Sequence, residues 1–214
     1  MATVPISNAP KAFNMNDFKA ITEKYGSLAK AHRFAVRLKP AGSWLANYSG
    51  FMPDLSYLCE IAEIPGRGFM NMDVRYYGPS NKLPFQSSYE DISMSFLCRN
   101  AALERQFFDD WMTIINPVNT FDFNYRDDYV SEIDIFQYSN VGDEHEAQYW
   151  ITLHDAYPIN LNPQPVQWAD DQVQKLVMTF TYSYWTRKGL DPEPRYGEPG
   201  GFSYSLVEGR EVNR

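Results

Sequence analysis

Alternating hydrophobic and polar residues run through the middle of the chain and predict β-strands. In residues 33–39, Phe34, Val36 and Leu38 alternate with small or basic residues, and Pro40 follows. A period of two places the hydrophobic side chains on one face of an extended strand. The same alternation predicts further strands over residues 55–64, 70–77, 85–89 leading into 91–99, 120–125, 131–137, 148–154 and 176–185.

One long segment repeats its hydrophobic residues at helical spacing instead. Over residues 101–115, Leu103, Phe107 and Trp111 recur every four positions, which predicts an amphipathic helix packed on the sheet. The predicted inner stripe is Leu103, Phe107, Trp111, Ile114 and Ile115, and the predicted outer face is Glu104, Arg105, Asp109 and Asp110. We expect Asn100 to cap this helix and Pro117 to end it.

The two ends of the chain differ from this patterned middle. The start is polar and rich in asparagine, with a short helix predicted over residues 15–25, and the end collects glycine and proline without any period. We predict an N-terminal arm over residues 1–32, a mostly antiparallel β domain with one packed helix over residues 33–186, and a C-terminal extension over residues 187–214.

Composition narrows the functional classes. The chain has 214 residues, 44% of them hydrophobic and 21% charged, which is ordinary for a folded protein. Aromatic residues make up 16%, a share that favours strands and protein contacts. The net charge of −8 argues against gripping a phosphate backbone, although DNA could still pass along such a surface without sticking.

The sequence shows no hydrophobic run long enough to span a bilayer, and residues 1–16 lack the apolar core of a signal peptide. Cys59 and Cys98 both lie in strand-like runs. We expect them to be buried free thiols in a reducing compartment rather than a disulfide, which places synthesis of the chain in the cytosol.

Candidate catalytic residues are few, and none forms a set. Paired aspartates occur at Asp109-Asp110, Asp127-Asp128 and Asp170-Asp171, but adjacent aspartates in helices or turns usually face water. The sequence Glu144-His145-Glu146 lacks the spacing of a metal site, and His154-Asp155 has no accompanying nucleophile. No phosphate-binding glycine loop is present. We therefore expect no enzyme activity, no metal and no cofactor.

A cluster of aromatic residues, Trp44, Tyr48 and Phe51, lies in a loop predicted over residues 42–54. Such a cluster can fill the core of its own domain or can form a contact surface for a sugar or a protein. The sequence leaves these alternatives open.

Several stretches, in this order, resemble the tail tube proteins of contractile-tailed phages. They are residues 58–66, ending in Pro65-Gly66; residues 89–99 followed by 107–111; Asp155-Ala156-Tyr157-Pro158, interpreted as an aromatic-proline turn; residues 166–168; and residues 174–185, ending in Tyr184-Trp185. The resemblance covers about residues 33–185. It implies an antiparallel β-sandwich or partial barrel with one flanking α-helix, six copies of which join edge to edge into a ring.

The resemblance also implies a function and partners. Stacked rings would form the conduit for DNA ejection in a virion tail, and the chain would be made in the host cytoplasm. Implied partners are other copies of the chain, adjacent rings, tail sheath and baseplate hub proteins, and a tape-measure protein and DNA in the lumen, with no membrane. Both a repeating tube subunit and a baseplate tube initiator fit this pattern. An unrelated alternative is a carbohydrate-binding or hydrolytic β-sandwich.

Residues 66–88 are the candidate ring-stacking segment. Cations and aromatic residues are mixed there among turn residues, a mixture typical of contact surfaces. The candidates are Arg67, Phe69, Arg75, Lys82 and Phe85. The alternative is an ordinary long hairpin packed on its own domain.

Overall fold

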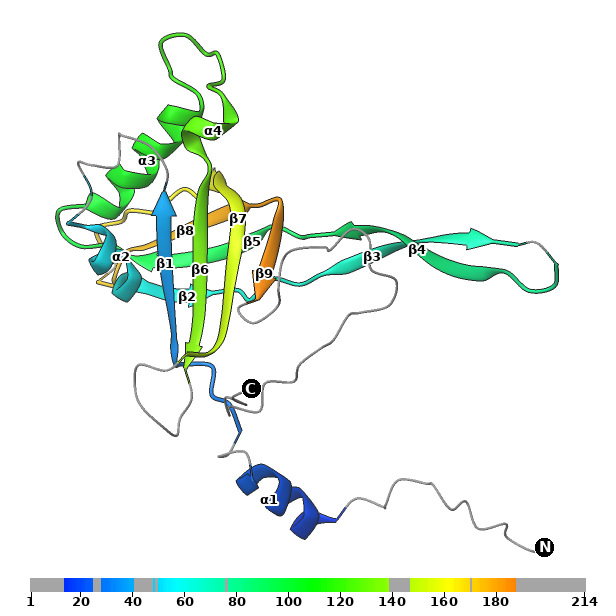
Figure 1. The fold of residues 1–214 in the computed structure, drawn as a ribbon. Coiled ribbons are helices and arrows are strands. Elements are labelled where there is room, and N and C mark those ends of the chain that lie inside the picture. The colour runs from blue at the N-terminus through cyan, green and yellow to red at the C-terminus, as the bar shows by residue number, and fades with distance from the viewer. Residues whose placement is uncertain are drawn as a thin grey trace, which may run out of the picture.

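A computed structural model describes residues 14–24, 28–40, 48, 50–75, 77–138, 147–169 and 171–187. Most strands in these ranges form one antiparallel sheet in the order β1-β6-β7-β8-β5-β2, with β9 also paired to β7 (Figure 1). The strands of this sheet are β1 (Phe34–Pro40), β2 (Cys59–Ala62), β5 (Ile92–Leu97), β6 (Ser131–Tyr138), β7 (Ala147–Leu161), β8 (Lys175–Thr181) and β9 (Tyr184–Arg187).

The remaining elements are four helices and a separate hairpin. The helices in the described ranges are α1 (Met15–Lys24), α2 (Met52–Leu58), α3 (Leu103–Ile115) and α4 (Arg126–Tyr129). Strands β3 (Gly68–Val74) and β4 (Asn81–Ser88) pair only with each other among the described strands and extend away from the sheet (Figure 1). None of the helices in the described ranges is long and apolar enough to cross a membrane.

Strand β7 is shared by two halves of the sheet. Its first part pairs with β6 on one side and β9 on the other, with Leu153 opposite both Ile133 and Trp185. Its last part pairs with β8, where Tyr157 lies opposite Thr181. Between the two parts, Asp155 has a φ of 54°, in the left-handed region where a non-glycine residue is uncommon. The sheet therefore folds over on itself but remains open between its edge strands β1 and β2.

Helix α3 packs against this folded sheet through aromatic side chains. Phe107, Phe108 and Trp111 have no exposed surface. The ring of Trp111 lies 6.1 Å from that of Phe180 on β8, and its Nε1 donates a hydrogen bond of 2.8 Å to the carbonyl oxygen of Tyr129. Sheet residues complete the core: Val36, Ile133, Ile135, Ile151, Leu153, Ile92, Met94, Phe96, Leu176, Met178 and Phe180.

The structure confirms the mainly antiparallel β class and most of the predicted elements. The strands predicted over residues 33–39, 91–99 and 131–137 correspond to β1, β5 and β6. The helix predicted over residues 15–25 corresponds to α1, which buries none of its residues. The strand predicted over residues 70–77 is β3, which begins two residues earlier.

Several strand boundaries were wrong. Residues 52–58 form helix α2, with Pro53 in its first turn and Leu55 buried, so β2 keeps only the end of the predicted strand 55–64. Residues 121–125 form no strand: they pair with no strand in the described structure, and Phe121 begins the segment with a φ of 57°. The predicted turn at residues 155–158 lies inside β7, and the predicted strand 176–185 is divided into β8 and β9 at the same bend.

The facing of α3 was correct for Phe107 and Trp111 but wrong for two neighbours. Leu103 is 38% exposed, whereas Glu104, predicted to face water, is fully buried. Glu104 accepts hydrogen bonds from the backbone N–H and the Nε of Arg99, at 3.1 and 2.7 Å, and these bonds satisfy its charge. The residue before the helix is Ala102 in a left-handed conformation, so Asn100 is not the cap.

We expect Trp111→Ala to lower the free energy of unfolding by about 3–5 kcal/mol, because it leaves a large void in a closely packed aromatic core. Thr113→Ala, on the exposed side of the same helix, should change it by less than about 0.5 kcal/mol. Urea unfolding followed by circular dichroism measures both variants. Equal midpoints for the two variants would show that the packing of α3 contributes little to stability.

Candidate assembly surfaces

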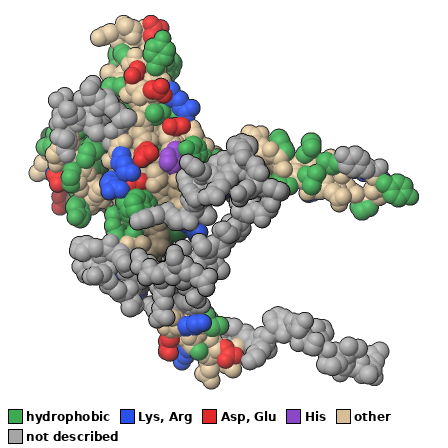
Figure 2. Space-filling view, viewed as in Figure 1, with side chains coloured by type: hydrophobic (Ala, Val, Ile, Leu, Met, Phe, Trp, Pro, Cys, Tyr) green, Lys and Arg blue, Asp and Glu red, His purple; other side chains and the backbone are tan. Residues whose placement is uncertain are grey.

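The β3–β4 hairpin is exposed along most of its length. It projects from the sheet as a two-stranded arm, and hydrophobic side chains lie along its length (Figures 1 and 2). Its exposed hydrophobic residues are Phe69, Met70, Met72, Leu83 and Phe85. An isolated two-stranded hairpin is only marginally stable in water, and clustered hydrophobic side chains on a surface usually mark a contact.

The base of the hairpin is fixed to the body. Trp185 on β9 donates from Nε1 to the carbonyl oxygen of Gly66, at 3.1 Å. The guanidinium of Arg67 lies over the rings of Phe69 and Tyr89, at 5.2 and 5.9 Å, and donates to Ser87 Oγ at 3.3 Å. These contacts hold the direction in which the arm leaves the sheet.

The predicted stacking residues all lie on this arm, but at different distances from the body. Phe69 pairs with Ser87 near the base, and Lys82 lies opposite Asp73 near the tip. Arg75 follows the end of β3, and Gly78, with a φ of 79°, lies in the turn that a side chain would strain. Phe69 and Phe85 are 56% and 61% exposed, so their own domain does not cover them. Arg67 is held at the base by its own hairpin, whereas Arg75 and Lys82 lie exposed toward the tip.

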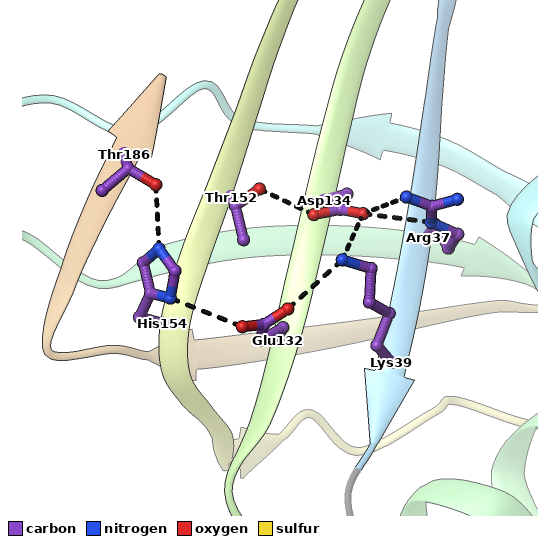
Figure 3. A network of polar contacts seen from close by, with 7 residues as sticks. All are labelled: Arg37, Lys39, Glu132, Asp134, Thr152, His154 and Thr186. Carbon is purple, nitrogen blue, oxygen red and sulfur yellow. Dashed lines mark hydrogen bonds and ion pairs between the residues drawn. The ribbon is translucent and has the colours of Figure 1, made fainter. Parts of the chain in front are cut away.

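A second surface, on the outer face of β1, β6, β7 and β9, carries a chain of polar contacts (Figure 3). At its centre is Asp134 of β6, whose carboxylate is fully buried. Arg37 donates to it from Nε and a terminal nitrogen at 3.0 and 2.5 Å, and Thr152 donates at 2.8 Å. Lys39 lies 2.9 Å from the same carboxylate.

The chain of contacts continues across the sheet to its last strand. Lys39 also contacts Glu132 at 3.2 Å, and Glu132 lies 3.6 Å from Nδ1 of His154. The Nε2 of His154 is 2.8 Å from Thr186 Oγ1, and the imidazole stacks on Tyr184. Two basic and two acidic side chains neutralise one another here, so this face joins four strands by side-chain contacts.

Burial alone would raise the pKa of Asp134, but the hydrogen bonds from Arg37, Lys39 and Thr152 outweigh it and hold the pKa below its ordinary value. In the sequence, this network is indicated only by charged residues at alternate positions of two predicted strands, 33–39 and 131–137. Only the register, with Arg37 opposite Asp134 and Asp134 opposite Thr152, brings the partners together.

The aromatic loop predicted as a possible contact surface lies in the core where it is described. Tyr48 and Phe51 pack against Phe107, with ring centroids at 5.3 and 6.0 Å. Burial, together with a hydrogen bond to Asp110, raises the pKa of Tyr48 to about 12. Trp44 lies outside the described residues. The core interpretation is therefore confirmed for Tyr48 and Phe51.

The other candidate residues do not converge on a reaction centre. Asp109 pairs with Arg105, and Asp155 pairs with Arg126, each at 3.1 Å. Asp127 and Asp128 lie in the first turn of α4. Across the described ranges, no three His, Cys, Asp or Glu side chains gather as metal ligands would. Residues 144–146 and Asp170 lie outside those ranges.

Both cysteines are free thiols and half-buried. Burial raises the pKa of Cys59 to about 12 and also raises the pKa of Cys98. Both thiols therefore stay protonated at neutral pH, which makes them poor nucleophiles.

Comparison with known proteins identifies the class of protein to which this fold belongs. A chain from the PVC extracellular contractile injection system, in its sheath/tube terminator structure, aligns with a TM-score of 0.55 and 15% identity over 75% of this chain and 96% of that one. A chain from the anti-feeding prophage baseplate aligns with a TM-score of 0.54 and 14% identity over 76% and 96%. A chain from the PVC sheath–tube complex aligns with a TM-score of 0.52 and 15% identity over 83% and 99%.

These alignments show a shared fold. At the level of sequence, the profile described as "Phage tail tube protein" matches residues 29–188. The chain therefore belongs to the phage tail tube protein family. No curated protein sequence matched the chain.

We expect Asp134→Asn to lower the free energy of unfolding by about 1–3 kcal/mol at pH 7, because it removes the charge that Arg37 and Lys39 face. A carboxylate whose pKa is lower in the folded state than in the unfolded state stabilises the folded state. This stabilisation is complete above the pKa of the unfolded state, near 4, and is lost as the pH falls through the pKa of the folded state. The difference from wild type should therefore shrink below pH 4. Glu132→Gln, at a half-exposed site, should cost less than about 1 kcal/mol. A difference for Asp134→Asn that stays constant from pH 7 to pH 2 would contradict this account.

Proposed function

We propose that this chain is a structural subunit of a phage tail tube, which forms hexameric rings that stack into the conduit for DNA ejection. The observation that carries the proposal is the projecting β3–β4 hairpin of a tail tube family member, with its hydrophobic side chains uncovered. Such an arm gains stability when a neighbouring subunit covers it. We propose a structural role in place of an enzymatic one, since the family to which the chain belongs is described as a tail tube protein family.

The open sheet supports a ring. Its path ends in two different strands, β1 and β2, each of which has one unpaired edge within the described structure. Exposed edges tend to pair with other chains, and a head-to-tail contact closes into a ring when the rotation between subunits is right. An arm that leaves the body can then serve contacts between rings.

The negative net charge of the chain supports a lumen through which DNA passes without binding tightly. With a net charge of −8, a ring of several copies would be strongly acidic, and like charge keeps DNA from adhering to a lumen. The proposed partners are adjacent rings, the tail sheath, baseplate hub proteins, and a tape-measure protein inside the tube. Support for the sheath and the baseplate comes from structural neighbours found in a sheath–tube complex and in a baseplate.

A second candidate is a protein at a tube end, such as the baseplate initiator on which the tube polymerises. Two of the structural neighbours favour this role, because one comes from a terminator structure and the other from a baseplate. The carbohydrate-binding or hydrolytic alternative loses support because Tyr48 and Phe51 are used in the core.

The proposal predicts six-fold rings or tubes from the purified protein at high concentration, visible by negative-stain electron microscopy and detectable by light scattering. Long tubes would favour the repeating subunit, and single rings that grow only with another tube protein would favour the initiator. A species that stays monomeric at every concentration would falsify the proposal.

Shortening the hairpin turn by removing residues 79–82 should leave the subunit folded and able to form rings, because the hairpin contributes nothing to the core. It should stop rings from stacking, since the tip then cannot reach a neighbour. Unchanged thermal unfolding, together with rings but no tubes on grids, is the expected result. Tubes of normal length from this variant would show that another segment carries stacking.

A further inference from the structure

The hairpin and one exposed loop, described over residues 162–169 and 171–174 and called loop 162–174 below, leave the body at opposite ends of the same strands. β4 leads into β5 at Ile92, and β2 leads toward β3 after Ala62, which lies opposite Met94 on β5. The loop instead leads into β8 at Lys175, which lies opposite Leu97 at the other end of β5. The hairpin and the loop are therefore separated by the full length of β5 and its neighbouring strands.

The loop is anchored at its base and exposed beyond it. Gln164 donates to the carbonyl oxygen of Lys175 at 3.0 Å and to Cys98 Sγ at 3.3 Å, which fixes the start of the loop against β5 and β8. Beyond this anchor, Val166 is 85% exposed and Trp168 is fully exposed, at 108%. A tryptophan with no cover from its own chain is unusual, and tryptophan is the residue most enriched among interface hot spots.

The charges of the two segments are complementary. Residues 66–88, which contain the hairpin, carry three basic residues, Arg67, Arg75 and Lys82, against the single acid Asp73. Residues 162–174 carry Asp170 and Asp171 and no lysine or arginine. Of these charged residues, Arg75 and Lys82 lie exposed toward the hairpin tip, and Asp171 is exposed in the loop. A cation that meets an indole face gains further attraction from the ring.

We propose that residues 162–174, centred on Trp168, are the surface on a second copy of this chain that receives the β3–β4 hairpin of the next ring. The inference rests on the proposed function, because it assigns the acceptor for the arm of a stacking ring. A contact between opposite ends of a subunit does not close on itself, so it repeats from ring to ring and builds a tube. Hydrophobic side chains of the arm pack on Trp168 and Val166, while Arg75 and Lys82 face Asp171.

The test uses two variants of the full chain, each of which lacks one half of the contact. Trp168→Ala keeps the hairpin and loses the acceptor, and removal of residues 79–82 keeps the acceptor and loses the tip. Each variant alone should form rings that do not stack at protein concentrations about tenfold above those at which wild type stacks. Preformed rings of the two variants, mixed in equal amounts, should form pairs of rings and nothing longer, because only one hairpin face and one acceptor face remain usable.

Controls separate this inference from the proposed function. Phe123→Ala removes another exposed aromatic, in the segment between α3 and α4, and should stack as wild type does. Asp171→Lys provides a second acceptor variant and should weaken stacking most at low salt. Thermal unfolding of each substitution variant should match wild type, because the replaced side chains are exposed.

Normal stacking by Trp168→Ala would overturn the assigned acceptor and leave the tube function standing. Loss of stacking in Phe123→Ala alone, or a mixture that gives no ring pairs, would also overturn it. Failure of the wild type to form rings or stacks at all would overturn the proposed function together with this inference.

Discussion

The bend in β7 at Asp155 is the constraint on which the rest of the fold depends. A fifteen-residue strand can belong to two half-sheets only if its backbone turns between them, and the left-handed conformation of Asp155 makes that turn. Arg126 holds it from outside, by a contact with the Asp155 carboxylate at 3.1 Å and a hydrogen bond to Ser183 Oγ. Ser183 lies between β8 and β9, and its N–H donates a hydrogen bond to the carbonyl oxygen of His154. The β8–β9 segment therefore bends next to the bend in β7, with which it pairs. Aspartate is among the few residues that tolerate this conformation, and the two halves that it brings together share one hydrophobic core with the aromatic side chains of α3.

The body of the domain pairs or buries many of its charged and hydrophobic side chains, whereas the β3–β4 hairpin leaves hydrophobic side chains exposed. On the body, Asp134 and Glu104 are fully buried, and each is paired with a basic side chain. Buried charges without partners would cost several kcal/mol, so these pairs permit burial. The pair of Asp134 with Arg37 also favours the register of β1 and β6. On the arm, Phe69, Met72 and Phe85 remain half or more exposed. Part of the hydrophobic surface that is left uncovered thus lies on a segment whose base is fixed by Trp185 and Arg67, which suits a contact with a defined direction.

The sequence could predict those features that depend on local pattern. Alternation revealed β1, β5 and β6, and helical spacing revealed Phe107 and Trp111, because each element buries a row of hydrophobic side chains that recurs at its own period. It could not predict Glu104 or Asp134 as buried residues, since their charge is neutralised by Arg99 across a reversal of the chain and by Arg37 on another strand. Helix α2 was missed because its short span alternates like a strand, although Pro53 in its first turn is typical of a helix start. The hairpin was predicted as a contact segment from its composition, but its projection from the body, and the position of residues 162–174 at the opposite end, follow from the register of β2, β5 and β8 alone.

The neighbours share the fold at about 15% identity, so the fold places few demands on individual residues. The core needs hydrophobic volume at set positions, and many sequences supply it. Recognition of one copy by another makes a stricter demand, because the surfaces must fit each other and reject related chains that fold in the same way. Complementary charges meet that demand better than hydrophobic contact does: Phe69 or Trp168 would pack against many apolar partners, whereas Arg75 and Lys82 favour an acidic acceptor and are repelled by a basic one. In this chain the basic residues lie on the arm and the acidic ones on the loop at the far end, so each surface repels its own kind. Head-to-tail stacking is then favoured over head-to-head stacking, and a tube built in this way keeps a single polarity along its length.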